Sequence, residues 1–155
     1  KQWRELPRHF FTKIINFQNF SVKFPKKEHT MSRRIFVFGS NTTGRHGKGA
    51  ALFARQNHGA IYGQGDGLQG NSYAIATRFA NPVGVAYHGI RSLTLAKIRP
   101  NIERFVAFAH AHPELTFDLT RVGCGLGGFS DAEIAPMFKG IPSNVIPPKE
   151  FLPYL

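Results

Sequence analysis

Glycines and cations gather in the segment Gly44–Gly49, shortly after an apolar run that ends at Gly39. β-branched and aromatic residues follow one another over Ile35–Phe38 without alternating with polar ones, which indicates a strand buried on both faces. Good helix formers begin at Ala50. A strand, a glycine-rich turn and a helix start direct several unpaired main-chain N–H groups at one point, beside the positive end of a helix dipole. This order of elements predicts a binding site for a phosphate or another anion.

A second segment of the same kind, Gly123–Phe129, follows a predicted strand over 115–122 and precedes a predicted helix over 132–138. In an open α/β sheet, ligands bind where such loops leave the carboxyl ends of the strands. Two loops of this kind that flank one crevice can wrap both phosphates of a diphosphate with main-chain donors. We therefore expect the two glycine loops to converge in space.

Four side chains in or beside these loops are candidates for binding or chemistry. Asn41 is either a ligand contact or a turn residue that bonds its own backbone. His46 is either a general acid–base, because imidazole titrates near neutrality, or a solvated loop histidine. Lys48 either pairs with phosphate as a point charge or keeps the loop soluble. Cys124 is either a nucleophile whose thiolate is favoured by nearby N–H groups, or a small buried residue.

The clearest helix signal lies over residues 95–111. Apolar residues recur there at three- and four-residue spacing, which places Ile98, Ile102 and Phe105 on a core face. Proline is best tolerated in the first turn of a helix, so Pro100 favours a start near Ile98.

Predicted strands and helices alternate along the chain, which is typical of a three-layer α/β domain. Ser130 or Asp131 is expected to cap the helix over 132–138. The other predicted elements are a helix over 47–58, strands over 59–62, 72–77 and 144–146, a turn-rich stretch over 63–71 and irregular chain over 78–91.

The composition fits one globular domain in a reducing cytoplasm. At 155 residues with 42% hydrophobic residues, the chain is long and apolar enough to bury a core. A single cysteine excludes an internal disulfide framework and zinc-finger spacing. No apolar run approaches the roughly 18 residues of a membrane span. The net charge of +11 raises the alternative of a nucleic-acid partner.

The first thirty residues differ from the rest. They contain no glycine and carry seven Lys or Arg residues against two acidic ones. Lys27 and Glu28 can be encoded AAG-GAG, a ribosome-binding sequence shortly upstream of Met31. We therefore expect the native protein to start at Met31 and residues 1–30 to be upstream DNA read as protein. The alternative is a basic N-terminal arm that contacts phosphates without sequence specificity.

The segments around both glycine loops resemble the macro domains, a family that binds ADP-ribose or removes it from modified targets. Residues Phe36–Asn41 are similar to the family's strand that ends in an asparagine, and Gly44–Leu52 resembles its first ligand loop and helix start. Gly70–Thr77 is similar to the strand that follows, and Gly123–Phe129 resembles the loop that wraps the diphosphate. The nearest likeness is to the small macro-like proteins of bacteria and phages.

This resemblance implies a three-layer α/β/α macro-like domain over residues 31–155, with a mixed, mostly parallel sheet. It also implies that Asn41 contacts the distal ribose and orients a water there, and that Phe129 packs on the ribose. The catalytic candidates are Asn41 and His46, and neither a metal nor a cofactor is expected. The expected ligand-binding residues are Ser40, Asn41, Gly44, Gly47, Lys48, Gly49, Ala50, Gly123, Cys124, Gly125, Leu126, Gly127, Gly128 and Phe129.

The resulting expectation is a protein that binds ADP-ribose or a related nucleotide diphosphate, with hydrolysis of an ADP-ribosyl bond or a terminal phosphate as its activity. Arg45, His46 and Lys48 add charge that suits a more anionic ligand, such as a terminal phosphate monoester or an RNA end. The alternatives are a non-catalytic nucleotide-sensing or sequestering module and a basic nucleic-acid-binding protein. The nucleic-acid alternative is less favoured, because no recognition helix or aromatic stacking consensus is found.

Overall fold

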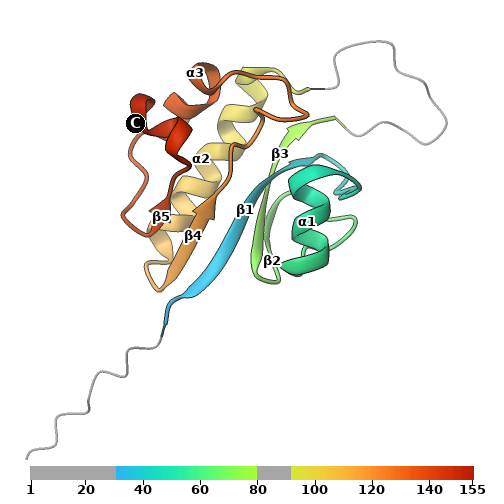
Figure 1. Cartoon of the computed structure of the whole chain (residues 1–155), viewed down its shortest axis with the longest axis horizontal. Helices are drawn as coiled ribbons and strands as arrows, with labels where there is room; N and C mark the ends of the chain where they lie inside the picture. Colours follow the sequence, from blue (N-terminus) through green and yellow to red (C-terminus); the bar gives the residue numbers. More distant parts are fainter. Residues whose placement is uncertain (1–30, 80–91) are drawn as a thin grey trace, which may run out of the picture. The chain divides into compact units, whose positions relative to one another are not determined.

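A computed structural model describes residues 31–79 and 92–155 of the chain, and the expectations for residues 1–30 and 80–91 lie outside them. The described residues form a five-stranded sheet in the order β2-β3-β1-β4-β5 (Figure 1). The central strand β1 (Arg33–Asn41) is parallel to both neighbours, β3 (Ser72–Arg78) and β4 (Leu115–Leu119). The short β5 (Val145–Ile146) is parallel to β4, and β2 (Gly67–Gln69) is antiparallel to β3. The predicted α/β class with a mixed, mostly parallel sheet is confirmed.

Helices cover both faces of this sheet (Figure 1). Alternate residues of β1 point to opposite sides, so Ile35 and Val37 join one apolar cluster while Phe38 joins another. The first cluster lies under α2 (Leu95–Ala111), and the second lies under α1 (Gly49–Asn57). The three layers are therefore α1, the sheet and α2. The remaining elements are α3 (Asp131–Ile134) and the 3₁₀-helices η3 (Ala135–Phe138) and η4 (Lys149–Tyr154).

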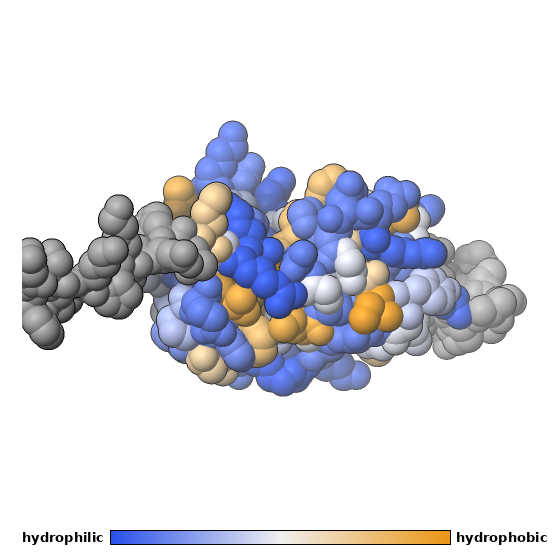
Figure 2. All heavy atoms as spheres, turned by 90° about the horizontal axis from the view of Figure 1, so that it is seen from below, coloured by the Kyte–Doolittle hydropathy of each residue, from blue (hydrophilic) through white to orange (hydrophobic). Residues whose placement is uncertain are grey.

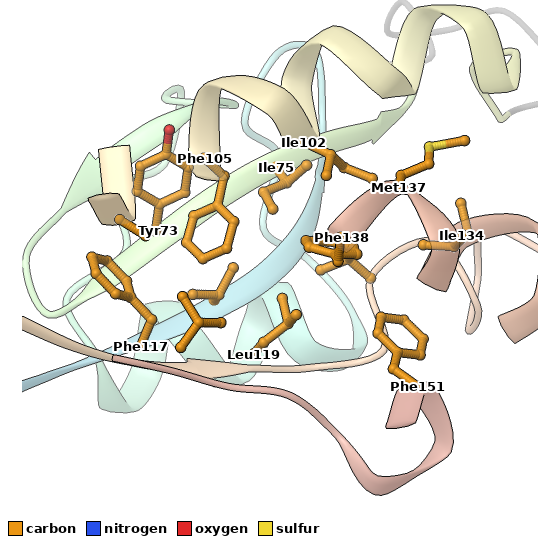
Figure 3. Close-up of a cluster of buried hydrophobic side chains, with 14 of the residues drawn as sticks. Tyr73, Ile75, Ile102, Phe105, Phe117, Leu119, Ile134, Met137, Phe138 and Phe151 are labelled. Carbon is orange, nitrogen blue, oxygen red and sulfur yellow. The ribbon is translucent and has the colours of Figure 1, made fainter. Parts of the chain in front are cut away.

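Phe105 of α2 lies at the centre of the larger cluster (Figure 3). Its ring centroid is 5.1 Å from that of Tyr73, 5.4 Å from that of Phe117 and 6.3 Å from that of Phe138, each in an edge-to-face arrangement. Rings in this geometry gain energy beyond the burial of their area. Replacing a buried Phe of this kind with Ala costs about 3–5 kcal/mol. This cluster fixes α2 over β1, β3 and β4, and so fixes the strand ends that carry the loops.

The predicted bounds of α2 are confirmed, but its start is not near Ile98. The helix begins at Leu95 because Thr94 caps it, accepting a hydrogen bond at Oγ1 from the N–H of Lys97 at 3.3 Å. Pro100 therefore lies inside the helix rather than in its first turn. Ile98, Ile102 and Phe105 are fully buried, as the spacing predicts.

The strand predicted over residues 59–62 is wrong. The edge strand beside β3 is instead β2, which lies within the stretch predicted as turns. Gly70 and Asn71 form the tight turn between β2 and β3, with Gly70 at a φ of 56°. A side chain on Gly70 would meet the main chain of Gly59 at 2.6 Å, so this hairpin packs directly on the end of α1.

The surface is mainly hydrophilic on the face shown in Figure 2, where apolar residues lie in small groups among charged and polar ones. Among the described residues, no helix is both long and apolar enough to cross a membrane.

Candidate functional site

A cleft of about 680 Å³ opens at the carboxyl ends of the three central strands. It is lined by residues from the end of β1, the end of β3 and the loop after β4, together with the start of α1. This is the edge at which ligands bind in open parallel sheets, because the connections diverge there to opposite faces. The described residues that line it are Gly39, Ser40, Asn41, Arg45, Gly47, Lys48, Gly49, Ala50, Ala51, Thr77, Arg78, Phe79, Thr120, Arg121, Val122, Gly123, Gly125, Leu126 and Gly127.

The two glycine loops meet at this cleft. The main-chain N of Gly123 is 3.4 Å from the position that a Cβ on Gly39 would occupy, so the second loop passes directly over the end of β1. Gly49 is similarly close to Leu126, whose Cδ1 is 3.8 Å from the position of such a Cβ. The convergence predicted from the sequence is therefore present in the structure.

Glycine is required in the second loop at Gly127. A Cβ there would lie 2.5 Å from the carbonyl oxygen of Gly123, a separation that only a main-chain shift could relieve. The loop is further held by two hydrogen bonds, from Phe129 N to Gly123 O at 3.0 Å and from Gly128 N to Gly125 O at 3.0 Å. The result is a compact turn whose main chain reaches the cleft without side chains in between.

Main-chain N–H groups are the donors that both loops offer. The helix α1 starts at Gly49 without a side-chain cap, whereas Thr94 caps α2 and Ser130 caps α3 with a full capping box. The first N–H groups of a helix have no intrahelical acceptor, and the helix dipole adds partial positive charge there. In the second loop, the N–H groups of Gly125, Leu126 and Gly127 donate to no other described residue. Both sets of donors are suited to phosphate oxygens.

The first loop is shaped by the side chain of Asn41. Its Oδ1 accepts from the N–H of Arg45 at 2.9 Å and from the hydroxyl of Thr43 at 3.2 Å. Its Nδ2 donates to the carbonyl oxygen of Arg45 at 2.8 Å. Asn41 lines the cleft, but both ends of its amide are engaged within the loop. The geometry thus matches the alternative of a turn residue that bonds its own backbone, and Asn41 fixes the shape of the first loop.

Positive charge dominates the described lining of the cleft. Arg45, Lys48, Arg78 and Arg121 are its charged residues, and no acidic residue is among them. Arg121 is partly neutralised by Asp131, which accepts from its Nε at 2.9 Å and from its Nη2 at 2.8 Å. These hydrogen bonds hold the pKa of Asp131 below its usual value. The cleft is therefore an anion-attracting surface.

His46 lies outside the cleft lining, and the expectation of a solvated loop histidine is wrong. It is fully buried, and its ring packs edge-on against Phe38 with centroids 5.2 Å apart. Its Nε2 lies 3.1 Å from Gln64 O and 3.2 Å from Gln69 Oε1. Both partners are acceptors, because Gln69 Oε1 also accepts from the N–H of Ile61 at 2.7 Å. His46 Nε2 is therefore the protonated nitrogen, and the ring connects the first loop to Gln64, before β2, and to Gln69, the last residue of β2.

Cys124 is held as a thiol and is also absent from the lining. Its Sγ lies 3.6 Å from the carbonyl oxygen of Val122, to which it donates. Burial, followed by the hydrogen bond and charge of Asp131, raises the pKa of Cys124 to about 12. A nucleophilic cysteine needs the opposite shift. The geometry matches the alternative of a small, partly buried residue.

The structure separates the predicted site residues into two groups. Ten of the predicted ligand residues line the cleft, namely Ser40, Asn41, Gly47, Lys48, Gly49, Ala50, Gly123, Gly125, Leu126 and Gly127. Gly44, Cys124, Gly128 and Phe129 are not among the lining residues, and Cys124 and Phe129 pack against the core cluster. Among the described residues, no group of three His, Cys, Asp or Glu side chains is arranged to hold a metal ion.

Sequence reasoning missed the contribution of β3. Thr77, Arg78 and Phe79 all line the cleft, and Phe79 is 45% exposed there. No motif marks these residues, but residues 72–77 were predicted as a strand of a mostly parallel sheet. A strand that runs parallel to β1 ends at the same edge as the first loop, and this was the available signal.

Comparisons of the chain with protein-family models, with curated proteins and with solved structures gave no match.

Proposed function

We propose that the protein binds a nucleotide diphosphate of the ADP-ribose kind in the cleft between its two glycine loops. The single observation that carries this proposal is the meeting of the loops, with Gly49 against Leu126 and Gly39 against Gly123. Each loop offers main-chain N–H groups, and together they match the two phosphates of a diphosphate.

Three features of the cleft support this ligand. Its volume of about 680 Å³ lies within the range of small-molecule sites. Its described charged residues are all cations. Its apolar lining residues, such as Phe79 and Leu126, are exposed at 45% and 61%, and apolar surface of this kind suits the base and ribose rings of a nucleotide. A site for an isolated inorganic anion would not need that surface.

Calorimetric titration of the full chain with ADP-ribose tests the proposal. Saturable binding is expected with ADP-ribose, and adenosine at the same concentrations should give no signal because it lacks the diphosphate. Absence of binding at millimolar ADP-ribose would reject the proposal. Analysis of the same samples for released ribose or phosphate then decides between a hydrolase and a non-catalytic binding module.

Salt dependence separates this proposal from nucleic-acid binding. A surface that neutralises many phosphates with Lys and Arg loses affinity steeply as salt rises, because counterions are released on binding. A diphosphate held chiefly by main-chain N–H groups should respond less. Titrations of ADP-ribose and of a short RNA at two salt concentrations therefore distinguish the two functions.

A further inference from the structure

Arg78 has donor capacity at the cleft that no other described residue uses. It is the last residue of β3, it is half-buried, and it lines the cleft. Its Nε is buried and has no hydrogen-bond partner. None of the ion pairs formed by the described residues includes it. Buried polar groups are normally hydrogen-bonded, and a partly buried charge is costly when it is unpaired, so this arrangement needs an explanation.

The main chain of Arg78 is fixed between the two glycine loops. Its carbonyl oxygen accepts from the N–H of Thr42 at 3.0 Å, at the start of the first loop. On its other side Arg78 forms an isolated bridge with Ser92, and the Ser92 hydroxyl donates to the carbonyl oxygen of Gly127 in the second loop. Because Arg78 is anchored to both loops, it is placed to contact the terminal phosphate of a diphosphate that the two loops surround.

Two of the other three cations that line the cleft, Arg121 and Lys48, differ from Arg78. The guanidinium of Arg121 already forms two hydrogen bonds to Asp131. Lys48 is exposed at the start of α1 and offers a point charge. Only a guanidinium presents a planar fork that binds two oxygens of one phosphate, and such charge-assisted pairs are about twice as strong as neutral hydrogen bonds.

We propose that Arg78 binds a free terminal phosphate, so that the cleft favours a nucleotide whose diphosphate ends in that group over one whose terminal phosphate is esterified. This proposal rests on the proposed function, because it assumes a nucleotide diphosphate in the cleft. A terminal phosphate carries about two negative charges near neutral pH, whereas an esterified one carries about one. The terminal group is thus the stronger partner for an arginine with unused donors.

Two commercial probes with the same adenosine diphosphate core test this selectivity. ADP ends in a free phosphate, and ADP-ribose carries a ribose on that phosphate. Calorimetry with the full chain should show tighter binding of ADP than of ADP-ribose. Arg78→Gln should weaken ADP binding by roughly tenfold to a hundredfold, the usual loss for one hydrogen-bonded charged pair. ADP-ribose binding should change by much less.

Two further variants complete the test. Arg99→Gln removes the same charge from the exposed side of α2, away from the cleft, and should leave both affinities unchanged. Arg78→Lys keeps the charge without the fork, and it should give an intermediate loss of affinity for ADP. It also provides a readout if Arg78→Gln does not fold.

Equal losses of affinity for ADP and ADP-ribose in Arg78→Gln, or tighter binding of ADP-ribose by the unmodified protein, would overturn the selectivity while leaving the proposed function intact. Failure of the unmodified protein to bind either probe would overturn both.

Discussion

Leu126, in the second glycine loop, lies against Gly49, the first residue of α1. Its Cδ1 is 3.8 Å from the position that a Cβ on Gly49 would take. Gly49 has a φ of 56°, a conformation in which glycine alone is unstrained. Both residues line the cleft, so two loops that follow different strands approach each other there.

Leu126→Ala should affect ligand binding but not stability. Leu126 is 61% exposed, so its truncation should change the free energy of unfolding by about 0.5 kcal/mol or less. Loss of its apolar contact should weaken ADP-ribose binding by about threefold to tenfold. Leu152→Ala is the matched control, because Leu152 is 58% exposed and does not line the cleft. Equal affinities of the two variants in calorimetry would show that Leu126 does not contact the ligand.

Gly127→Ala should destabilise the second loop, whereas Gly125→Ala should be tolerated. A Cβ on Gly127 would lie 2.5 Å from Gly123 O, while one on Gly125 meets nothing within 4 Å. We expect Gly127→Ala to cost about 1–3 kcal/mol, as overpacking does, and Gly125→Ala to cost about 0.5 kcal/mol or less. Urea unfolding of both variants measures the difference. Similar midpoints would contradict the tight packing of the loop.

Asn41→Ala should loosen the first loop. The substitution removes both the acceptor for the N–H of Arg45 and the donor to its carbonyl oxygen. Asn41→Asp keeps the acceptor and loses only the donor. Because groups left without partners cost about 1–3 kcal/mol each, the alanine variant should be the less stable of the two in thermal unfolding. If Asn41 instead acts only on a ligand, both variants would unfold like the unmodified protein and differ from it in binding alone.

Cys124 should react slowly with alkylating reagents at neutral pH. Burial and Asp131 raise its pKa to about 12, whereas the ordinary value is 9.0. Because the folded state binds the thiol proton more tightly than the unfolded state, this group stabilises the fold below about pH 9, and that contribution is lost as the pH rises toward about 12. Iodoacetamide labelling against pH measures the reactive fraction. Labelling as fast as that of free cysteine at pH 8 would contradict the assignment.

A helix or strand could be predicted from the sequence wherever its own residues showed a distinctive spacing or a capping residue. The spacing of Ile98, Ile102 and Phe105 predicted α2, and of the two expected caps, Ser130 and Asp131, Ser130 is the one that caps α3. The strand β2 has only three residues, too few to show alternation, so it was read as part of a turn. The pair Gly70 and Asn71 was the available hairpin signal.

The candidate site could be predicted in part, because glycine-rich loops after buried strands mark the carboxyl edge of a sheet. The burial of His46 could not, since it depends on Gln64 and Gln69, which are 18 and 23 residues away. The position of Arg78 also depends on tertiary structure, since it follows from the pairing of β3 with β1. Side-chain type left His46 open between an acid–base and a solvated loop residue, and its packing buries it outside the lining of the cleft.

Amide chemical shifts of the ¹⁵N-labelled full chain during titration with ADP-ribose give the most direct test of the central claim. We predict that the amides of Gly49, Ala50, Gly125, Leu126 and Gly127 shift together and saturate at one ligand concentration, because both loops would bind one diphosphate. Shifts confined to one loop, or gathered on another surface such as the groove formed by Arg99, His110 and Lys139, would contradict it.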